Sequence, residues 1–402
     1  MNRGWQMLFF VGMMVVVLFA WHGYLWMRLV REPGWPALAT RILTVTLVAL
    51  ALSIPAAFIL SRALPYSLSM PLALVAFTWM GLSFYFLVTV GAADLLRVAG
   101  NGLEALVRWL RSGSGELLLE DPERRQLLAR AVGAVALAGA GVAGVGGLRN
   151  AMGSVKTKVV EVPLPRLPAA LDGFSLVQLT DLHIGNVLGR SFLQAVVERV
   201  NGLAPDAVVI TGDLVDGSVE HLKALIEPLA GLRSRHGTFF VTGNHEYYSG
   251  APEWEQHLRD MGITVLDNQH VTLAQDSQGR GGLDLAGVPD PTARMLGAQR
   301  EPDVARAVAG RDVNNPLVLL AHQPKAIDDA VKNGVGLVLS GHTHGGQIWP
   351  FGYVVALTQP YLAGLHHHDD TYIYVSRGTG FWGPPLRLGA PAEITRVVLR
   401  SA

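Results

Sequence analysis

The chain has no cysteine among its 402 residues and few charged side chains. Without thiols it cannot form disulfide bonds, thiolate metal sites or a cysteine nucleophile. Asp, Glu, Lys and Arg together make up only 16% of the residues, and the 32 basic residues balance the 32 acidic ones. Because no net positive field exists to attract nucleic acid, we expect no nucleic-acid partner.

Half of the residues are instead hydrophobic, and the mean hydropathy is +0.32. This composition is more apolar than that of soluble proteins and predicts membrane spans. Four uncharged stretches reach the length of a transmembrane helix, and we interpret residues 1–150 as a membrane domain. The fourth stretch is short and rich in Gly and Ala, which favours close packing on neighbouring helices. The predicted helices cover residues 4–27, 42–60, 63–93 and 131–148.

The arginines that flank these stretches predict the orientation of the chain. The first and third connecting segments hold nine arginines, whereas the N-terminal end and the second segment hold only Arg3 and Arg62. Arginine-rich connections stay in the cytoplasm, so four spans place everything after residue 148 outside it. The chain is then a multi-pass protein of the inner (plasma) membrane with an extracytoplasmic second domain. A fourth segment that only re-enters the membrane would instead leave this domain in the cytoplasm.

The third connection, Leu95 to Arg130, is predicted to be a loop with helical stretches on the inner face of the membrane. Its pair Arg124-Arg125 resembles a twin-arginine export signal and is equally explained as basic flanking charge. Both interpretations give the same topology. Residues Arg149 to Val155 are predicted to be a short linker.

Residues 156–402 have the composition of a soluble domain, in which apolar runs predicted as strands first alternate with amphipathic helices. Closely spaced strands follow, which suggests two packed sheets with helices outside them. Five of the strands end in side chains of the metal-binding type, and such ends lie along one edge of an open α/β sheet. The side chains at these five ends are Asp181 and His183, Asp213, Asn244 and His245, His322, and His342 and His344.

The order and spacing of these clusters resemble the calcineurin-like metallophosphoesterases. Their signature, D-x-H, G-D, G-N-H-(D/E), H and G-H-x-H, is matched at every position, and the resemblance extends from about Val160 to the end of the chain. The local sequence around Asn244 and His342 is most similar to that of a bacterial branch of membrane-associated phosphodiesterases. This branch includes enzymes that act on phosphorylated lipids. The resemblance implies a four-layer α/β/β/α sandwich after the N-terminal transmembrane helices.

The resemblance also implies a set of metal ligands, in which Asp213 bridges two ions. Seven ligands are too many for a single zinc ion, which prefers about four, and they suit two divalent ions. Oxygen and nitrogen ligands without thiolate fit manganese, iron or zinc, and the sequence does not choose among them. Besides Asp213, the ligands would be Asp181, His183 and His344 for one ion and Asn244, His322 and His342 for the other.

Two further residues have predicted roles beside the metals. The resemblance implies that His245 hydrogen-bonds the phosphate and protonates the leaving alkoxide, the alternative being a structural loop histidine. Asp216 could orient a histidine ligand from behind, or could be an ordinary surface acid. The run His366-His367-His368 looks like a metal-binding tract, but the adjacent Asp369-Asp370 favours a solvated turn.

These patterns predict a membrane-anchored enzyme that hydrolyses a phosphodiester or phosphomonoester, such as that of a membrane lipid or its head group. The two ions would lower the pKa of a water molecule and make a hydroxide available for attack on phosphorus. Two alternatives remain open: the same enzyme acting on a soluble nucleotide, and a non-catalytic membrane sensor or scaffold. A missing ligand would favour the sensor, and none is missing. The sequence leaves the oligomeric state open.

Overall fold

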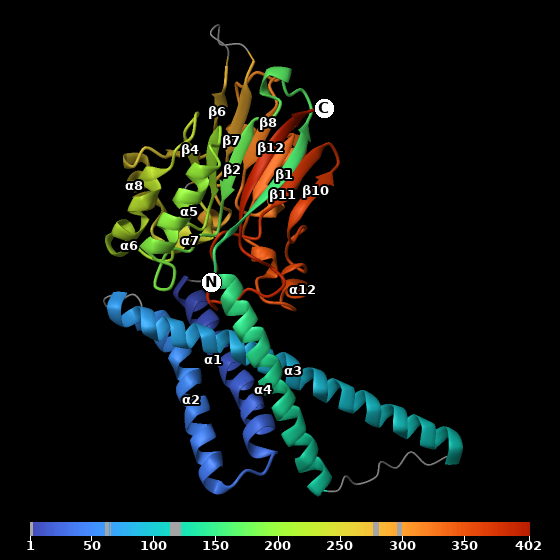
Figure 1. Ribbon diagram of the computed structural model, residues 1–402. Helices are drawn as coiled ribbons and strands as arrows, with labels where there is room; N and C mark the ends of the chain where they lie inside the picture. The colour runs from blue at the N-terminus through green and yellow to red at the C-terminus, as the bar shows by residue number, and fades with distance from the viewer. Residues whose placement is uncertain (1–2, 61–63, 65, 113–121, 276–280, 296–299) are drawn as a thin grey trace. The chain divides into compact units, whose positions relative to one another are not determined.

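The computed structural model describes all residues except 1–2, 61–63, 65, 113–121, 276–280 and 296–299. Arg62, which the orientation count uses, lies outside the described residues. The chain divides into two compact units, Met1–Gly146 and Gly147–Ala402 (Figure 1). Unit 1 is helical, and unit 2 contains the sheets.

Unit 1 is built from long apolar helices, as the composition predicts. Four helices are long and apolar enough to cross a membrane, and most of their side chains are exposed. Exposure of apolar groups on this scale is stable only in an apolar solvent. The helices are α1 (Arg3–Trp26), continued by the π-helical turn η1 (Met27–Arg31), α2 (Ala37–Leu60), α3 (Tyr66–Ser112) and α4 (Pro122–Met152).

Helix α3 differs from the prediction, because residues from Leu95 onward continue the helix instead of forming a loop. Good helix formers such as Leu, Ala and Arg dominate this part, and they outweigh the cost of Gly100 and Gly102. At 1.5 Å per residue the helix is about 70 Å long, more than twice the hydrocarbon thickness of a bilayer. Only part of α3 therefore fits within a membrane.

Helix α4 is also longer than the predicted fourth span, since it begins at Pro122 and continues to Met152 through most of the predicted linker. Its last residues, from Gly147 on, belong to unit 2. There Ala151 is 4% exposed and packs in the same core as Val177 and Leu193. The end of α4 is thus a structural part of unit 2.

Unit 2 contains two six-stranded sheets. The first has the order β1-β12-β2-β3-β4-β5, and β2 to β5 run parallel. The second has the order β10-β11-β9-β8-β7-β6, in which β11, β9, β8 and β7 run parallel. The strands are β1 (Lys156–Leu164), β2 (Ser175–Leu179), β3 (Ala207–Thr211), β4 (Thr238–Val241), β5 (Thr264–Val265), β6 (Gln269–Leu273), β7 (Leu283–Gly287), β8 (Leu317–Leu320), β9 (Leu337–Ser340), β10 (Gly364–His368), β11 (Thr371–Val375) and β12 (Glu393–Ser401).

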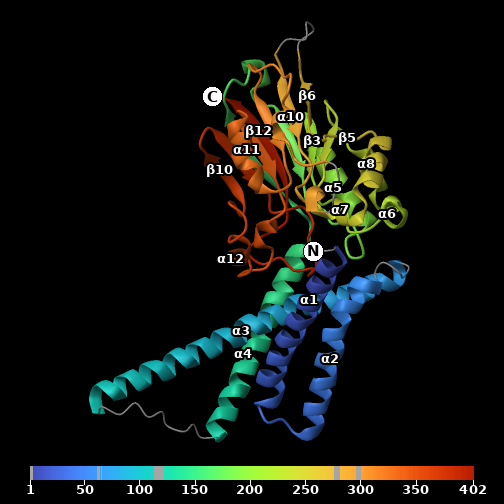
Figure 2. The same ribbon diagram turned by 180° about the vertical axis from the view of Figure 1, so that it is seen from behind.

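The sheets pack face to face, and helices cover their outer faces (Figures 1 and 2). Alternate residues of β3 show why both faces are apolar: Val209 packs between the sheets, whereas Val208 and Ile210 pack under helices. Helices α5, α6 and α8 cover the first sheet, and α10 and α11 the second. The helices of unit 2 are α5 (Arg190–Gly202), α6 (Val219–Ile226), α7 (Asn244–Ser249), α8 (Ala251–Asp260), α9 (Thr292–Met295), α10 (Val304–Ala307), α11 (Ile327–Lys332) and α12 (Gly352–Val355).

The predicted four-layer α/β/β/α sandwich is therefore confirmed. One local expectation was wrong: His366, His367 and His368 are part of the strand β10 and do not form a solvated turn. Pairing with β11 explains this, because His366 lies opposite Ile373 and His368 opposite Thr371. The turn follows at Asp369, which has a positive φ of 48°.

Candidate metal centre

The five predicted strand ends meet at one edge of the sandwich. Strands β2, β3 and β4 of the first sheet and β8 and β9 of the second all point their carboxyl ends to it. One or two residues separate the end of each strand from the first predicted ligand, so residues up to 163 positions apart in sequence share this edge. The structure brings together Asp181 and His183 after β2, Asp213 after β3, Asn244 at the start of α7, His322 after β8, and His342 and His344 after β9.

The backbone at this edge is bent unusually. Five of the seven predicted ligands have φ between 46° and 70°, a left-handed conformation that costs energy for residues other than glycine. These bends take the chain out of the extended conformation just beyond the strand ends, where the ligands lie. Gly341 leaves room for this arrangement, because a Cβ there would overlap Thr180 Oγ1 and Asp181 Oδ2. The five ligands are Asp181, His183, Asp213, His342 and His344.

The first group of ligand atoms comes from Asp181, His183 and His344, all less than 10% exposed. The two histidine Nε2 atoms are 3.1 Å apart, and His344 Nε2 lies 3.5 Å from Asp181 Oδ1. The backbone N–H of His342 donates to both oxygens of Asp181, and Thr180 Oγ1 donates to Oδ2 at 2.8 Å. These bonds fix the carboxylate in front of the two imidazoles.

The second group comes from Asp213, His322 and His342, with Asn244 beside it. His322 Nε2 lies 3.2 Å from Asp213 Oδ2 and 3.2 Å from His342 Nδ1, which is 3.0 Å from Asn244 Oδ1. The carbonyl of Thr211 accepts from His322 Nδ1 at 2.7 Å. Because that nitrogen is held by the carbonyl, Nε2 is the atom that His322 turns toward the group.

Asp213 lies between the two groups. Its Oδ2 is 3.2 Å from His322 Nε2 on one side and 3.7 Å from His183 Nε2 on the other. The backbone N–H of His245 donates to its other oxygen at 2.9 Å. A carboxylate in this position reaches both groups at once.

The donor set fits divalent cations. Ligands that share an ion about 2.0–2.2 Å away lie about 3–3.7 Å from one another, which is the spacing found in both groups. Burial opposes the charged form of Asp213, but His322 and His245 outweigh it and hold the pKa of Asp213 well below its usual range. Burial and the proximity of His322 lower the pKa of His342 to about 3, which leaves its ring neutral and able to bind a metal.

His245 and Asp216 form a pair beside these groups. His245 Nδ1 is 2.7 Å from Asp216 Oδ1, and the same oxygen is 2.9 Å from His183 Nδ1. Burial lowers the pKa of His245, but the carboxylates of Asp213 and Asp216 outweigh burial and raise it to about 9. The ring of His245 stands edge-on to Trp382 at a centroid distance of 5.7 Å. Asp216 thus contacts a predicted ligand and the predicted acid together.

Glu246 has a role that the sequence reasoning missed. It is fully buried, and its carboxylate accepts from the backbone N–H groups of Gly243, Asp213 and Leu214 at 2.6–3.0 Å. These bonds tie the loop after β3 to the start of α7. The position of Glu246 in the Gly-Asn-His-Glu cluster was the available signal, since an acid at the third helical position caps the helix N-terminus.

Arg387 is a second missed residue, and it is fully buried. Its Nη2 is 3.2 Å from His344 Nδ1, and the guanidinium donates to the carbonyls of Gly380 and Ala390. Because a guanidinium only donates, Nδ1 of His344 accepts, and His344 Nε2 can donate to His183. Arg387 is 43 residues from His344, and nothing in its local sequence predicts the contact.

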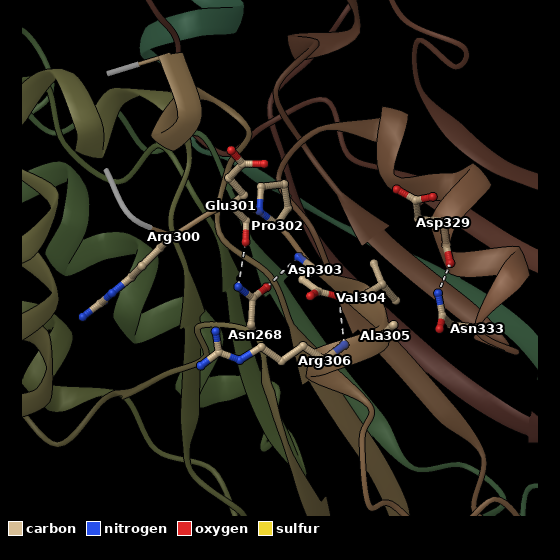
Figure 3. Close-up of a pocket in the computed structure, with 10 residues that line it drawn as sticks. All are labelled: Asn268, Arg300, Glu301, Pro302, Asp303, Val304, Ala305, Arg306, Asp329 and Asn333. Carbon is tan, nitrogen blue, oxygen red and sulfur yellow. Dashed lines mark hydrogen bonds between the residues drawn. The ribbon is translucent and has the colours of Figure 1, made fainter. Parts of the chain in front are cut away.

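Two other polar features of unit 2 lie apart from this centre. A hollow of about 530 Å³ lies around α10 (Figure 3). Its polar groups bond to one another: Asn268 donates to the carbonyl of Glu301 and accepts from Asp303 N–H, and Asp303 caps α10. Just before β10, Tyr361 stacks on His366 of that strand, and its hydroxyl is 2.7 Å from His368 Nδ1. We propose no ligand for either feature.

Comparison with known proteins identifies the family to which the chain and its metal-binding residues belong. The profile described as calcineurin-like phosphoesterase matches residues 174–346, which include all seven predicted ligands. A "transmembrane protein with metallophosphoesterase domain" of Danio rerio is 37% identical over 395 residues, which are 94% of this chain and 86% of that protein. The chain belongs to the calcineurin-like phosphoesterase family.

Two further relatives show the same relationship. A protein of the same name from Bos taurus is 38% identical over 75% of this chain and 69% of its own length. An uncharacterized metallophosphoesterase of Helicobacter pylori is 44% identical over 60% of this chain and 64% of its own length. As a member of the calcineurin-like phosphoesterases, the chain is a metal-dependent phosphoester hydrolase that uses divalent metal ions and carries apolar N-terminal helices.

Proposed function

We propose that the chain hydrolyses a phosphoester of a membrane lipid or its head group, with two divalent ions held by the seven residues of the strand ends. The position of Asp213 between two groups of ligand atoms carries this proposal, since one carboxylate can serve two ions. The first ion would take Asp181, His183 and His344, and the second Asn244, His322 and His342, with Asp213 shared.

Bound divalent ions would supply Lewis acidity toward the phosphoryl group and toward a water molecule. The chain's own residues would position the ligands and the phosphate and would supply the proton for the leaving group. Asp216 accepts from His245 Nδ1 and fixes the ring, which leaves Nε2 to hydrogen-bond a phosphate oxygen and to protonate the leaving alkoxide. Asp216 also holds His183 in the tautomer whose Nε2 faces the first group. Glu246 keeps the loop that carries Asp213 in place.

A lipid substrate is favoured by the membrane helices. Four helices exceed what a single tether requires, and relatives with the same domain are named transmembrane proteins. A soluble nucleotide remains the second candidate, because the same metal chemistry acts on any accessible phosphoester. A non-catalytic sensor is disfavoured, since every predicted ligand is present at the edge.

The substrate proposal is tested with the full-length protein, purified in detergent and supplied with Mn²⁺. Hydrolysis is compared for an aryl diester, an aryl monoester, a nucleotide and a glycerophospholipid. We expect the highest kcat/KM for the phospholipid. A preference for the nucleotide would establish the soluble alternative, and bound metal without hydrolysis of any of these esters would favour a sensor.

We further propose that the protein resides in the inner membrane with unit 2 on the extracytoplasmic side. The arginine bias between alternate connections supports this orientation, since arginine-rich connections are retained in the cytoplasm. Fusions of alkaline phosphatase and of a cytoplasm-dependent fluorescent protein after Gly153 separate the two orientations. Phosphatase activity supports the proposal, and fluorescence would place unit 2 in the cytoplasm.

A further inference from the structure

An exposed apolar surface lies next to the metal centre, on and around α12. Leu357 is 84% exposed and Tyr353 72% exposed, and no Asp, Glu, Lys or Arg occurs between Lys332 and Asp369. Monomeric soluble domains seldom expose such uncharged patches, which usually mark an interaction site. The α12 surface consists of Trp349, Phe351, Tyr353, Val354, Leu357 and Trp382.

This surface is built onto the loop that carries the last two predicted ligands. Figures 1 and 2 show α12 at the same end of unit 2 as α7, which begins with Asn244. Gly346, in the turn after His344, lies so close to Gly352 that a Cβ on Gly346 would overlap its backbone. Trp382 accepts from the side-chain amide of Gln347 at 2.9 Å and faces His245. The α12 surface and the metal centre are therefore parts of one rigid edge.

The same edge is bonded to the end of α4. The backbone N–H of Trp349 donates to the carbonyl of Leu388, and the N–H of the neighbouring Arg387 donates to the carbonyl of Gly147, each at 2.9 Å. Asn150 Nδ2 donates to the carbonyl of Arg387 at 3.2 Å. Gly147 and Asn150 are themselves residues of the fourth candidate membrane span, Arg125–Met152. Backbone hydrogen bonds thus connect Trp349 of the apolar surface to the segment Arg387-Leu388, and this segment to Gly147 of the candidate membrane helix.

We propose that the α12 surface docks on the lipid interface of the membrane that holds the chain's own helices. Trp and Tyr are the residues that gather at membrane interfaces, where the ring is in apolar surroundings and the N–H or O–H stays hydrated. Val354 and Leu357 would enter the acyl region, and residues 333–368 contain no Asp, Glu, Lys or Arg that docking would desolvate. A charged protein partner finds no complementary group on this surface.

Docking would place the metal centre at the level of the lipid head groups. A phosphoester in a head group would then reach His245 and the ligands beside Trp382 without leaving the membrane. This consequence rests on the proposed lipid substrate. Docking of the α12 surface does not depend on the lipid substrate, and a fluorescence experiment measures docking without any catalysis.

The absence of cysteine makes a direct test possible in the full-length protein. A single cysteine is introduced as Leu357→Cys, labelled with an environment-sensitive fluorophore, and reconstituted into phosphatidylcholine–phosphatidylglycerol vesicles that contain spin-labelled lipid. The matched control is Val313→Cys, because Val313 is 66% exposed and precedes β8, at the edge opposite the metal centre. We expect blue-shifted emission and several-fold stronger lipid quenching at position 357 than at 313.

Equal quenching at the two positions would overturn the proposal. A blue shift at 357 without quenching by lipid would overturn it too, because protein, such as a second copy, would then cover the surface. In a second variant, Tyr353→Glu and Leu357→Glu are combined with a label at Val354→Cys. The added charges should remove the quenching while the rate on a soluble aryl ester, which reports folding, stays unchanged; retained quenching would contradict docking.

Discussion

The two units of this chain differ in what they expose, since unit 1 exposes many apolar side chains and unit 2 buries most of its own. In unit 1, Leu38, Val45 and Val142 are 71%, 68% and 77% exposed, whereas every residue of β2 and β3 in unit 2 is buried. Unit 2 instead exposes its polar residues and gathers buried acids and histidines at one sheet edge. Apolar exposure suits a lipid solvent, and clustered titratable groups suit bound cations.

Unit 1 also has charged contacts, but they are of another kind. Arg28 pairs with Glu32 and Asp94, and Tyr24 donates to Asp94 at 2.6 Å. The described residues of unit 1 contain no group of three clustered ligand atoms, and those of unit 2 contain three such groups. The comparison predicts that hydrolysis depends on unit 2 and that unit 1 affects the metal centre little. The following substitutions test this division, from the largest expected effect to the smallest.

Asp213→Asn should abolish turnover and release both ions, because this carboxylate is proposed to serve two metals. The measurement is metal content by mass spectrometry together with hydrolysis of an aryl diester. Two tightly held equivalents with normal rates would disprove the shared position. Asp312→Asn, in an exposed turn before β8, is the matched control and should change neither quantity.

His245→Ala should keep the metal content and lower kcat by about 10²–10⁴-fold, the usual contribution of a general acid. The loss should be smaller for an aryl ester, whose leaving group needs no proton. Comparison of alkyl and aryl esters measures the difference. Equal losses on both esters would leave His245 with phosphate positioning alone.

Arg387→Lys should weaken metal binding by about 10–100-fold, the range found when residues that orient a ligand are changed. Lysine keeps the charge but loses the fork that spans Gly380, Ala390 and His344. Titration of the metal-free protein with Mn²⁺ gives the affinity. Arg400→Lys, on an exposed ion pair of β12, is the control, and equal affinity in both variants would argue against a positioning role.

Gly144→Ala, in the part of α4 that belongs to unit 1, should have the smallest effect. A Cβ there meets only the end of the flexible Leu82 side chain, which can move aside. We expect kcat on a soluble ester to stay within about two-fold, since overpacking by one methyl group costs about 1–3 kcal/mol of stability and lies here outside unit 2. A loss comparable to that of Arg387→Lys would show that helix packing in unit 1 controls the metal centre and would break the comparison.

The sequence by itself determined the chemistry of the edge. Asp181, His183 and His342 lie within four residues of the ends of apolar strands, so their exit from the sheet could be predicted from local hydrophobic patterns. The sandwich and the four apolar helices followed from the same periodicity and length arguments. These features depend on residues that are close together in the sequence, and such local patterns can be read from a single sequence.

Only the tertiary structure decided which groups face one another. Glu246 lies 33 residues from Asp213, Arg387 lies 43 from His344, and Asn150 lies 237 from Arg387. Such contacts depend on how the sheets stack and where the loops close, and no local pattern encodes them. The exposure of Leu357 was hidden for the same reason, because an apolar residue near a site is buried or exposed according to what packs over it.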